Sequence, residues 1–416
     1  MEASKTLPPI TEEQVRWAYT NCFEHIGCRL KTGVITCLEC GKSWKSNHTL
    51  TDSVCGCTCP DCGTKLKIHD TRKRVFRDFE YCCIMTVCSG FQVLRFFYVK
   101  YEAKSGEKAK YFHSEVVQQW IAPDGRYAIV ARLLPGGYYG SCWNFTSNLE
   151  IRPENSCHNI KTTCIYPCRQ FIPELKQRGF NGDFYHITPF KLFRVLLIYS
   201  KAETLLKAGQ TALLKHFTDG STYKKIDNYW AAVKICIRNG YQIEEAQIWC
   251  DYIDLLRFFN KDLHNAKYVC PADLKAEHDR YVNKKQEWHN REEREQARQH
   301  ALKDEAIFNR MKSRFFGMLF TDGLIEVRML ESVMEIMQES FAMCHCVFTN
   351  DYHLKPDSII LSAYMGKKRL ETVEFSLSEL KVRQSRGVCN QITEYHDRII
   401  NLVNDNRRLI KKRMTA

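Results

Sequence analysis

The sequence predicts an α+β fold made of several modules, and three patterns support this prediction. Two CxxC pairs lie close together near the N-terminus, strand-like alternation follows from about residue 76, and helical periodicity begins at about residue 156. The chain has 416 residues, which is enough for several buried cores. We therefore expect several domains that combine helices with antiparallel sheet.

Changes of pattern along the chain mark the expected segments. They are a helical lead (1–30), a zinc ribbon (31–75), an antiparallel β region (76–155), a helical region (156–270), a long charged helix (271–312) and a C-terminal α+β domain (313–416). Hydrophobic residues make up 44% of the chain, as in globular proteins.

The two CxxC pairs predict a metal site. Each pair is followed by glycine, in "CLECG" and "CPDCG", and a glycine there permits the tight turn that aims two thiolates at one point. Four thiolates suit tetrahedral Zn²⁺, and a closed shell of this kind is structural. We expect one structural Zn²⁺, and the alternative is four buried free thiols. Its ligands would be Cys37, Cys40, Cys59 and Cys62.

The chain contains 21 cysteines, including Cys28, Cys55 and Cys57 near the predicted site, to which we assign no role. The first residues do not resemble a signal peptide, and the apolar runs are shorter than a membrane span. We therefore expect a cytoplasmic location, reduced thiols and no membrane partner.

The charge balance favours a polyanionic partner. The formal net charge is +13, and basic residues cluster around the predicted ribbon. Cations beside an aromatic side chain suit phosphate contact with base stacking, so nucleic acid is the expected partner, DNA before RNA. The alternative is a ribbon that only stabilises an N-terminal module. The candidate contact residues are Lys42, Trp44, Lys45, Lys65, Lys67, Arg72, Lys73 and Arg74.

Strand-like runs follow the ribbon. "FQVLRFFYVKYEA" and "KYFHSEVVQQWIA" are rich in Val, Tyr and Phe, and the turn sequences "KSGEK" and "APDG" bound them. These runs predict an antiparallel sheet.

Two helices are expected in "NYWAAVKICIRNGYQIEEAQIWCDYIDLLRFF". A DNA-binding helix-turn-helix is rejected, because the second helix carries several carboxylates and would enter a groove lined with phosphates. A packed helical hairpin is expected instead. Its core would hold Trp230, Cys236, Trp249 and Leu255.

The remaining sequence predicts a long exposed helix and a second α+β domain. The helix would cover the Gly-free charged segment from about 272 to 312, with i,i+4 charge pairs along its faces. The domain would contain a strand, a helix and further strands in this order, and it would end in one amphipathic helix, "ITEYHDRIINLVNDNRRLIKKRM".

Four stretches of the chain resemble the PcfJ-like family. They are "YWAAVKICIRNGYQIEEAQIWCDYIDLL", "KDLHNAKYVCPADLKAEHD", "MCHCVFTNDYH" and "ETVEFSLSELKVRQSRGVCNQ", and the similarity is expected to cover about residues 80–410. The family is associated with conjugative plasmids and integrated mobile elements of bacteria. The resemblance therefore implies a genomic setting more than a reaction.

Two groups of polar residues are candidates for chemistry. Carboxylates and imidazoles between 251 and 279 could bind a divalent metal, although capping and solvated roles explain them equally. The other group is His345, Tyr352, His353, Tyr364, Glu374, Gln384, Arg386 and Asn390. His345, Glu374 and Arg386 are its candidate catalytic residues, and a structural pairing of Arg386 with Glu374 is the alternative.

The leading hypothesis is a zinc-ribbon protein that binds nucleic acid as an accessory of a bacterial mobile element, in conjugation or DNA processing, together with protein partners. One alternative is a nucleic-acid-processing enzyme, centred in the C-terminal domain or on the Asp/His cluster. Another is a protein-assembly factor that does not bind nucleic acid.

Overall fold

The computed structural model describes residues 6–46, 49–134, 143–219 and 223–415. It divides into two compact units, residues 1–278 and 279–416. Both units combine helices with a β-sheet, so the predicted α+β class is confirmed.

The first unit begins with helix α2 (Glu12–Asn21) and a small five-stranded sheet. Thr11 and Gln14 form a capping box that starts α2. The strand order of the sheet is β3-β2-β1-β5-β4, in which β1 and β5 pair in parallel and the other pairs are antiparallel. Its elements are β1 (Ile26–Arg29), β2 (Val34–Cys37), β3 (Ser43–Lys45), β4 (Cys57–Thr58) and β5 (Lys65–Asp70), with helix α3 (Thr49–Cys55) between β3 and β4.

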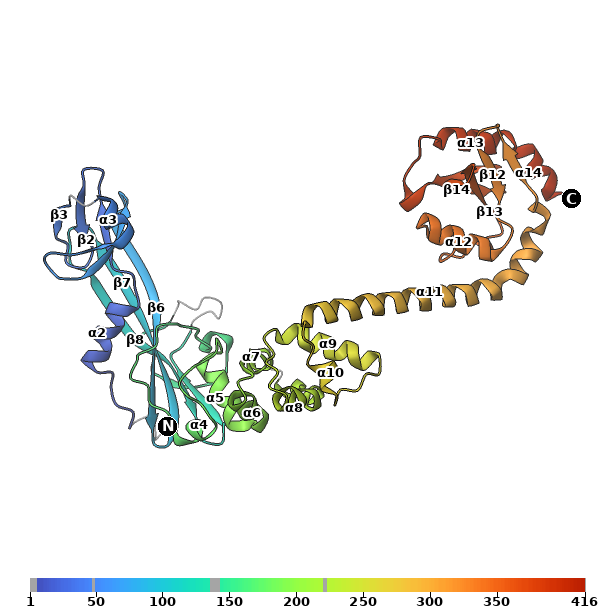
Figure 1. The fold of residues 1–416 in the computed structure, drawn as a ribbon. Helices are drawn as coiled ribbons and strands as arrows, with labels where there is room; N and C mark the ends of the chain where they lie inside the picture. The colour runs from blue at the N-terminus through green and yellow to red at the C-terminus, as the bar shows by residue number, and fades with distance from the viewer. Residues whose placement is uncertain (1–5, 47–48, 135–142, 220–222, 416) are drawn as a thin grey trace. The chain divides into compact units, whose positions relative to one another are not determined.

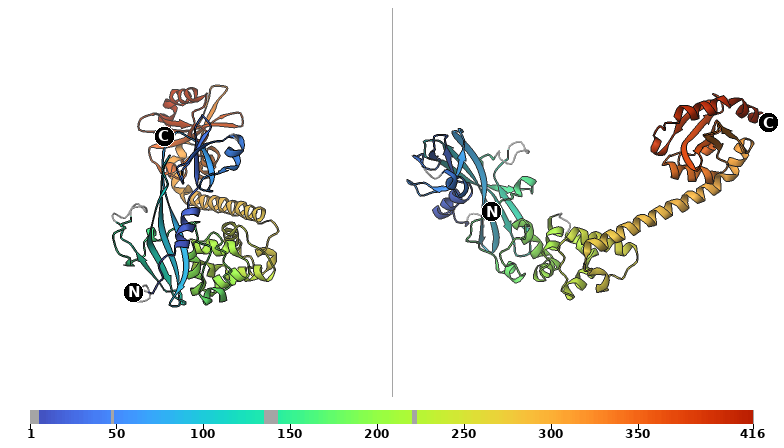
Figure 2. Two further views of the ribbon diagram at one scale, coloured as in Figure 1. Left: turned by 90° about the vertical axis from the view of Figure 1, so that its left-hand side faces the viewer. Right: turned by 45° about the horizontal axis from the view of Figure 1, so that its top comes forward.

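A long antiparallel meander follows, as the sequence predicts. Its strands run side by side in chain order, and three of them are much longer than the strands of the small sheet (Figures 1 and 2). Residues of β6 pair with β7 along their full length, from Val75–Lys104 to Cys88–Phe91. The strands are β6 (Val75–Cys88), β7 (Phe91–Lys104), β8 (Lys110–Ile121), β9 (Tyr127–Ala131) and β10 (Glu150–Arg152).

The rest of the first unit is helical. α8 and α9 are the two helices predicted for the hairpin. Cys236, Trp249 and Leu255 are buried as predicted, but Trp230 is only half-buried and is not part of the core. The indole N–H of Trp249 donates to the carbonyl oxygen of Val269 at 3.0 Å. The helices are η1 (Ser156–His158), α4 (Pro173–Gln177), α5 (Pro189–Ile198), α6 (Ser200–Lys207), α7 (Thr211–Asp219), η2 (Tyr223–Asn228), α8 (Trp230–Arg238), α9 (Ala246–Phe258) and α10 (Ala266–Val269).

Helix α11 (Leu274–Lys312) is the predicted long charged helix, with 39 residues in one uninterrupted run (Figure 2). Asp273 caps its start, since the Ala276 N–H donates to Asp273 Oδ1 at 2.9 Å. Most of its side chains are exposed, but Ala301 and Phe308 near its C-terminal end are buried in the core of the second unit. The last turns of α11 therefore belong to the packing of that unit.

The second unit is an antiparallel sheet of order β11-β12-β13-β14-β15 with helices on both faces. α12 contributes Glu339, which bonds to Ser362 and Thr372 on one face, and α13 contributes His396, which bonds to Glu371 on the other. Its elements are η3 (Ser313–Phe315), β11 (Leu319–Thr321), β12 (Glu326–Met329), α12 (Val333–Met343), η4 (Tyr352–Leu354), β13 (Ser358–Met365), β14 (Lys368–Ser376), β15 (Lys381–Arg386), η5 (Val388–Asn390), α13 (His396–Asp405) and α14 (Arg407–Met414).

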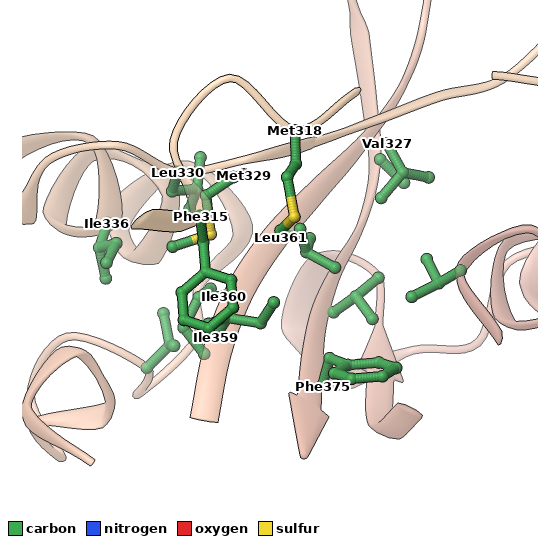
Figure 3. Close-up of a cluster of buried hydrophobic side chains, with 14 of the residues drawn as sticks. Phe315, Met318, Val327, Met329, Leu330, Ile336, Ile359, Ile360, Leu361 and Phe375 are labelled. Atoms are coloured by element: carbon green, nitrogen blue, oxygen red, sulfur yellow. The ribbon is translucent and has the colours of Figure 1, made fainter. Parts of the chain in front are cut away.

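A continuous apolar core holds this second unit together. Figure 3 labels ten side chains of this core, which come from the strands, from η3 and α12 and from the loops beside them. They are Phe315, Met318, Val327, Met329, Leu330, Ile336, Ile359, Ile360, Leu361 and Phe375.

The prediction of one final helix is wrong. α13 and α14 are separate helices that meet at Asn406, whose side-chain amide donates to the carbonyl oxygen of Leu402 at 2.8 Å. The break allows Ile410 to enter the core, where it is fully buried. An unbroken amphipathic pattern in the sequence gives no sign of this bend.

Within the part of the chain that the structure describes, no helix combines the length and the apolar composition that crossing a bilayer requires.

We expect Phe375→Ala to destabilise the second unit by about 3–5 kcal/mol, because it removes a fully buried ring from a packed core. Hydrogen exchange of the β13–β15 amides in the full chain measures this unit separately from the first. The matched control is Phe341→Ala in α12, where the ring is 46% exposed and the expected change is within about 0.5 kcal/mol. Equal effects of the two variants would contradict the assignment of this core.

Candidate functional site

The four predicted cysteine ligands converge at one point of the small sheet. The Cys37 and Cys62 sulfurs are 3.8 Å apart, the Cys40 and Cys59 sulfurs are 3.6 Å apart, and all four Sγ atoms lie within 4.8 Å of one another. A tetrahedral ion with metal–sulfur bonds of about 2.3 Å would separate its ligands by about 3.8 Å. A disulfide needs about 2.05 Å. The geometry therefore suits a metal ion and not two disulfides.

Each CxxC pair lies on the tight turn that its glycine permits. Gly41 and Gly63 adopt left-handed φ values of +81° and +72°. Their N–H groups donate back to the carbonyl oxygens of Cys37 and Cys59, both at 3.0 Å. The two turns have the same hydrogen-bond pattern, so both present their thiols in the same way.

The thiols of the cluster differ in their ease of ionisation. Burial raises the pKa of Cys37 and of Cys40. Burial also acts on Cys62, but hydrogen bonds with the side chain and backbone of Thr64 and with the Cys59 and Cys40 thiols lower the pKa of Cys62 to about 7. Since thiolates are the metal-binding form, Cys62 is available as a ligand nearer to neutral pH than Cys37 or Cys40.

The first turn is anchored to the long meander through Glu39, between Cys37 and Cys40. The Glu39 carbonyl oxygen accepts from the Ala109 N–H at 2.9 Å, and its Oε2 accepts from the Tyr111 hydroxyl at 2.8 Å. His25 Nδ1 lies 2.9 Å from Glu39 Oε1. Burial opposes ionisation of Glu39, but the bonds from His25 and Tyr111 lower its pKa.

Glu39, His25 and Tyr111 were not among the residues singled out from the sequence. A carboxylate between the two cysteines of "CLEC" was the one available signal, and its partners are distant in the chain. The anchor fixes the metal site on the tip of the β7–β8 hairpin.

The predicted nucleic-acid contact residues fall into two groups. Lys42, Trp44 and Lys45 lie on or beside the edge strand β3, while the others lie on β5 or in the segment after it, with β2 and β1 between the two groups. All seven cations are exposed. Trp44 is half-buried and packs against the core formed by Cys37, Cys59 and Leu66, so only part of its ring is accessible for stacking.

Two of these cations contact other side chains of the protein. Lys67 forms an exposed ion pair with Glu24 at 2.8 Å, and Lys73 lies over the ring of Phe76 at 4.9 Å. An exposed pair of this kind contributes about 0–1 kcal/mol, so phosphate oxygens could compete for Lys67 at little cost.

The second candidate site is a cavity of about 300 Å³ in the C-terminal unit. It contains the three predicted catalytic residues, His345, Glu374 and Arg386. His353 and Tyr364 are not among its lining residues. The cavity is lined by His345, Cys346, Val347, Tyr352, Ile360, Thr372, Glu374, Gln384, Arg386 and Asn390.

Alternation places Glu374 on the opposite face of β14 from Val373 and Phe375. Glu374 is nevertheless only 4% exposed, because both faces of β14 are covered. Glu374 Oε1 accepts from the Ser358 hydroxyl, and the guanidinium nearest to it, at 3.4 Å, is that of Arg383. The alternative that paired Arg386 with Glu374 is therefore wrong.

His345 has a defined tautomer in this cavity. Its Nε2 lies 2.6 Å from the carbonyl oxygen of Gly387, which can only accept, so Nε2 carries the proton. A buried carboxylate and an oriented imidazole in one small cavity are suited to binding a polar ligand or to proton transfer.

The Asp/His cluster between 251 and 279 has mainly structural contacts. Asp254 accepts from the Tyr229 hydroxyl at 2.8 Å, Asp251 accepts from Gln247, and Asp262 accepts from the His264 N–H. Among the described residues, the groups of three or more that could hold a metal are the four cysteines and His300, Asp304 and Asp351. The cluster is not one of these groups.

We expect Gly41→Ala to detach the first turn from the hairpin. A Cβ at Gly41 would lie 2.8 Å from the backbone of Gly106 and Glu107, whereas a Cβ at Gly63 would have no neighbour within 4 Å. Gly63→Ala is the matched control, since both variants bear a left-handed strain of roughly 1–2 kcal/mol. Hydrogen exchange of the Ala109 amide should become fast in Gly41→Ala alone. Equal protection in both variants would show that Gly41 does not dock there.

Comparisons with curated proteins and with solved structures gave no match. A family model matched a shorter range than the 80–410 expected from the resemblance. Three of the four quoted stretches lie wholly within the matched range, and the first overlaps its start. This match supports the PcfJ-like family for the part of the chain that it covers: residues 248–400 match the model of the PcfJ-like protein.

Proposed function

We propose that this chain binds nucleic acid through a zinc ribbon at its N-terminus. The observation that carries the proposal is the four-thiol cluster at tetrahedral spacing, with exposed cations on the strands and turns around it. Zn²⁺ is the proposed occupant because it prefers four thiolates in a closed shell, and such a shell has a structural role. The ribbon would then hold its surface cations in fixed positions.

Phosphate contact would supply most of the affinity. The exposed side chains of Lys42, Lys45, Lys65, Lys67, Arg72, Lys73 and Arg74 are lysines and arginines, which neutralise phosphates without reading sequence. The net charge of +13 favours encounter with a polyanion. DNA is the proposed ligand before RNA.

The family match supplies the proposed setting. We propose a cytoplasmic accessory protein of a bacterial mobile element, acting with protein partners in conjugation or DNA processing. The match of residues 248–400 to the PcfJ-like family supports this setting. In this proposal the PcfJ-like part of the chain, which includes most of the second unit, mediates assembly, while the ribbon contacts DNA.

A nucleic-acid-processing enzyme is the second candidate function. The observation that favours it is the cavity that brings His345, the buried Glu374 and Arg386 together. DNA cleavage abolished by Glu374→Gln, with DNA binding and folding retained, would favour this candidate over a purely binding role.

We expect Cys62→Ser to lower the zinc content of the purified chain by about one equivalent, because a closed site needs all four thiolates. Elemental analysis measures this directly. Cys55→Ser is the matched control, since Cys55 is also an exposed cysteine, at the end of helix α3, but lies outside the cluster. Equal zinc in the wild type and both variants would rule out a zinc ribbon.

We expect the affinity for duplex DNA to fall steeply as the salt concentration rises. The double variant Lys65→Ala/Lys67→Ala should reduce the slope of log K against log salt concentration by about 1.8, because each lost phosphate contact removes about 0.9. Lys65 and Lys67 lie on the same face of β5, two residues apart. Fluorescence anisotropy over a range of salt concentrations measures the slope.

The control is Lys367→Ala/Lys368→Ala, which removes two exposed lysines from the second unit and should leave the slope unchanged. Binding that does not depend on salt would contradict the proposal. So would identical slopes for the two double variants.

A further inference from the structure

A group of histidine and aspartate side chains in the second unit is not explained by the proposed function. His300 and Asp304 lie one turn apart on α11, and Asp351 and His353 lie on or beside η4. His300 Nε2 is 3.2 Å from Asp304 Oδ2 and 3.8 Å from Asp351 Oδ1. One ligand atom from each of these three residues lies within 4.8 Å of the others.

A buried histidine holds one of these carboxylates. The His353 side chain is fully buried, and its Nε2 lies 2.9 Å from Asp304 Oδ2. Its Nδ1 is buried without a hydrogen-bond partner among the described residues. The His353 ring also stacks on Phe348 with the ring centres 5.6 Å apart, which fixes its plane. Carboxylates that bind metals are themselves hydrogen-bonded by outer-shell groups, and His353 is placed to do this for Asp304.

The charge of the group also calls for a cation. Among the described residues, the ion-pair partners of Asp304 and Asp351 are histidines, and neither lysine nor arginine pairs with them. Asp351 has a left-handed backbone (φ +52°), an uncommon conformation for a residue other than glycine. A cation would compensate for placing these carboxylates together.

We propose that His300, Asp304 and Asp351 bind one divalent transition-metal ion, with His353 as the residue that positions Asp304. Mixed imidazole and carboxylate ligands suit ions such as Zn²⁺, Mn²⁺ or Co²⁺. Three protein ligands leave at least one coordination position for water or a ligand oxygen. His300 and Asp351 are exposed, so an ion can enter from solvent.

Such an ion would also fix one wall of the C-terminal cavity. Tyr352 lines that cavity, and its neighbours Asp351 and His353 are the residues that face α11. The ion would therefore join α11 to the segment that carries Tyr352. This site is separate from the four-cysteine cluster and does not depend on the proposed zinc ribbon.

The test is a Co²⁺ titration of the full-length chain whose cysteine cluster has first been filled with Zn²⁺. The expected result is one further bound Co²⁺ whose visible absorption lacks a thiolate charge-transfer band. His300→Ala and Asp351→Asn, both exposed positions, should each weaken the binding more than about 10-fold, and His353→Gln should weaken it by about 10–100-fold. His289→Ala, an exposed histidine on the same helix, is the matched control and should bind as the wild type does.

Three results would overturn the proposal. One is a wild-type chain that binds no further Co²⁺ at millimolar concentration. Another is a further Co²⁺ whose spectrum contains the thiolate band, which would place it on cysteines. The last is unchanged affinity in both His300→Ala and Asp351→Asn, since these exposed substitutions leave the core of the unit intact.

Discussion

The parallel pairing of β1 with β5 is the constraint on which the N-terminal site depends. It places Ile26 beside Lys67 and Arg29 beside Asp70, so the chain returns to β1 after about forty residues. The return brings Cys59 and Cys62 opposite Cys37 and Cys40. A sheet this small buries little apolar surface, and small domains of this kind usually need a metal or a docking surface. Glu39 supplies the docking here, through its bonds to the Ala109 amide and the Tyr111 hydroxyl.

The second unit buries several carboxylates in a sheet that is covered on both faces. Glu339, Glu371 and Glu374 are nearly inaccessible to solvent, and a buried carboxylate is costly unless it is well paired. Glu339 accepts from two hydroxyls and from Arg369, while Glu371 accepts from Ser385, Thr393 and His396. Burial opposes the ionisation of Glu371, but these bonds lower its pKa. Glu374 has fewer donors and faces the cavity, so it is the carboxylate best placed to meet a ligand.

The segment from His345 to His353 links the features of the second unit that are candidates for chemistry. His345 and Tyr352 line the cavity, whereas Asp351 and His353 meet His300 and Asp304 of α11. Consecutive residues of one short segment thus contribute to the cavity, through Tyr352, and to the histidine–aspartate group, through Asp351 and His353. The last turns of α11, which the sequence presents only as a charged helix, are therefore part of the structure around the cavity.

The sequence by itself determined the α+β class, the two CxxCG turns, the antiparallel meander and the helices α8 and α9. These depend on local patterns: cysteine spacing, glycine positions, alternation and helical period. Tertiary structure alone decided that Glu374 is buried, that Arg383 and not Arg386 approaches it, and that the final helix bends at Asn406. It also decided the Glu39 anchor and the meeting of His300 with Asp351, because these contacts join residues about fifty or more positions apart and no local pattern encodes which distant partner a side chain will face.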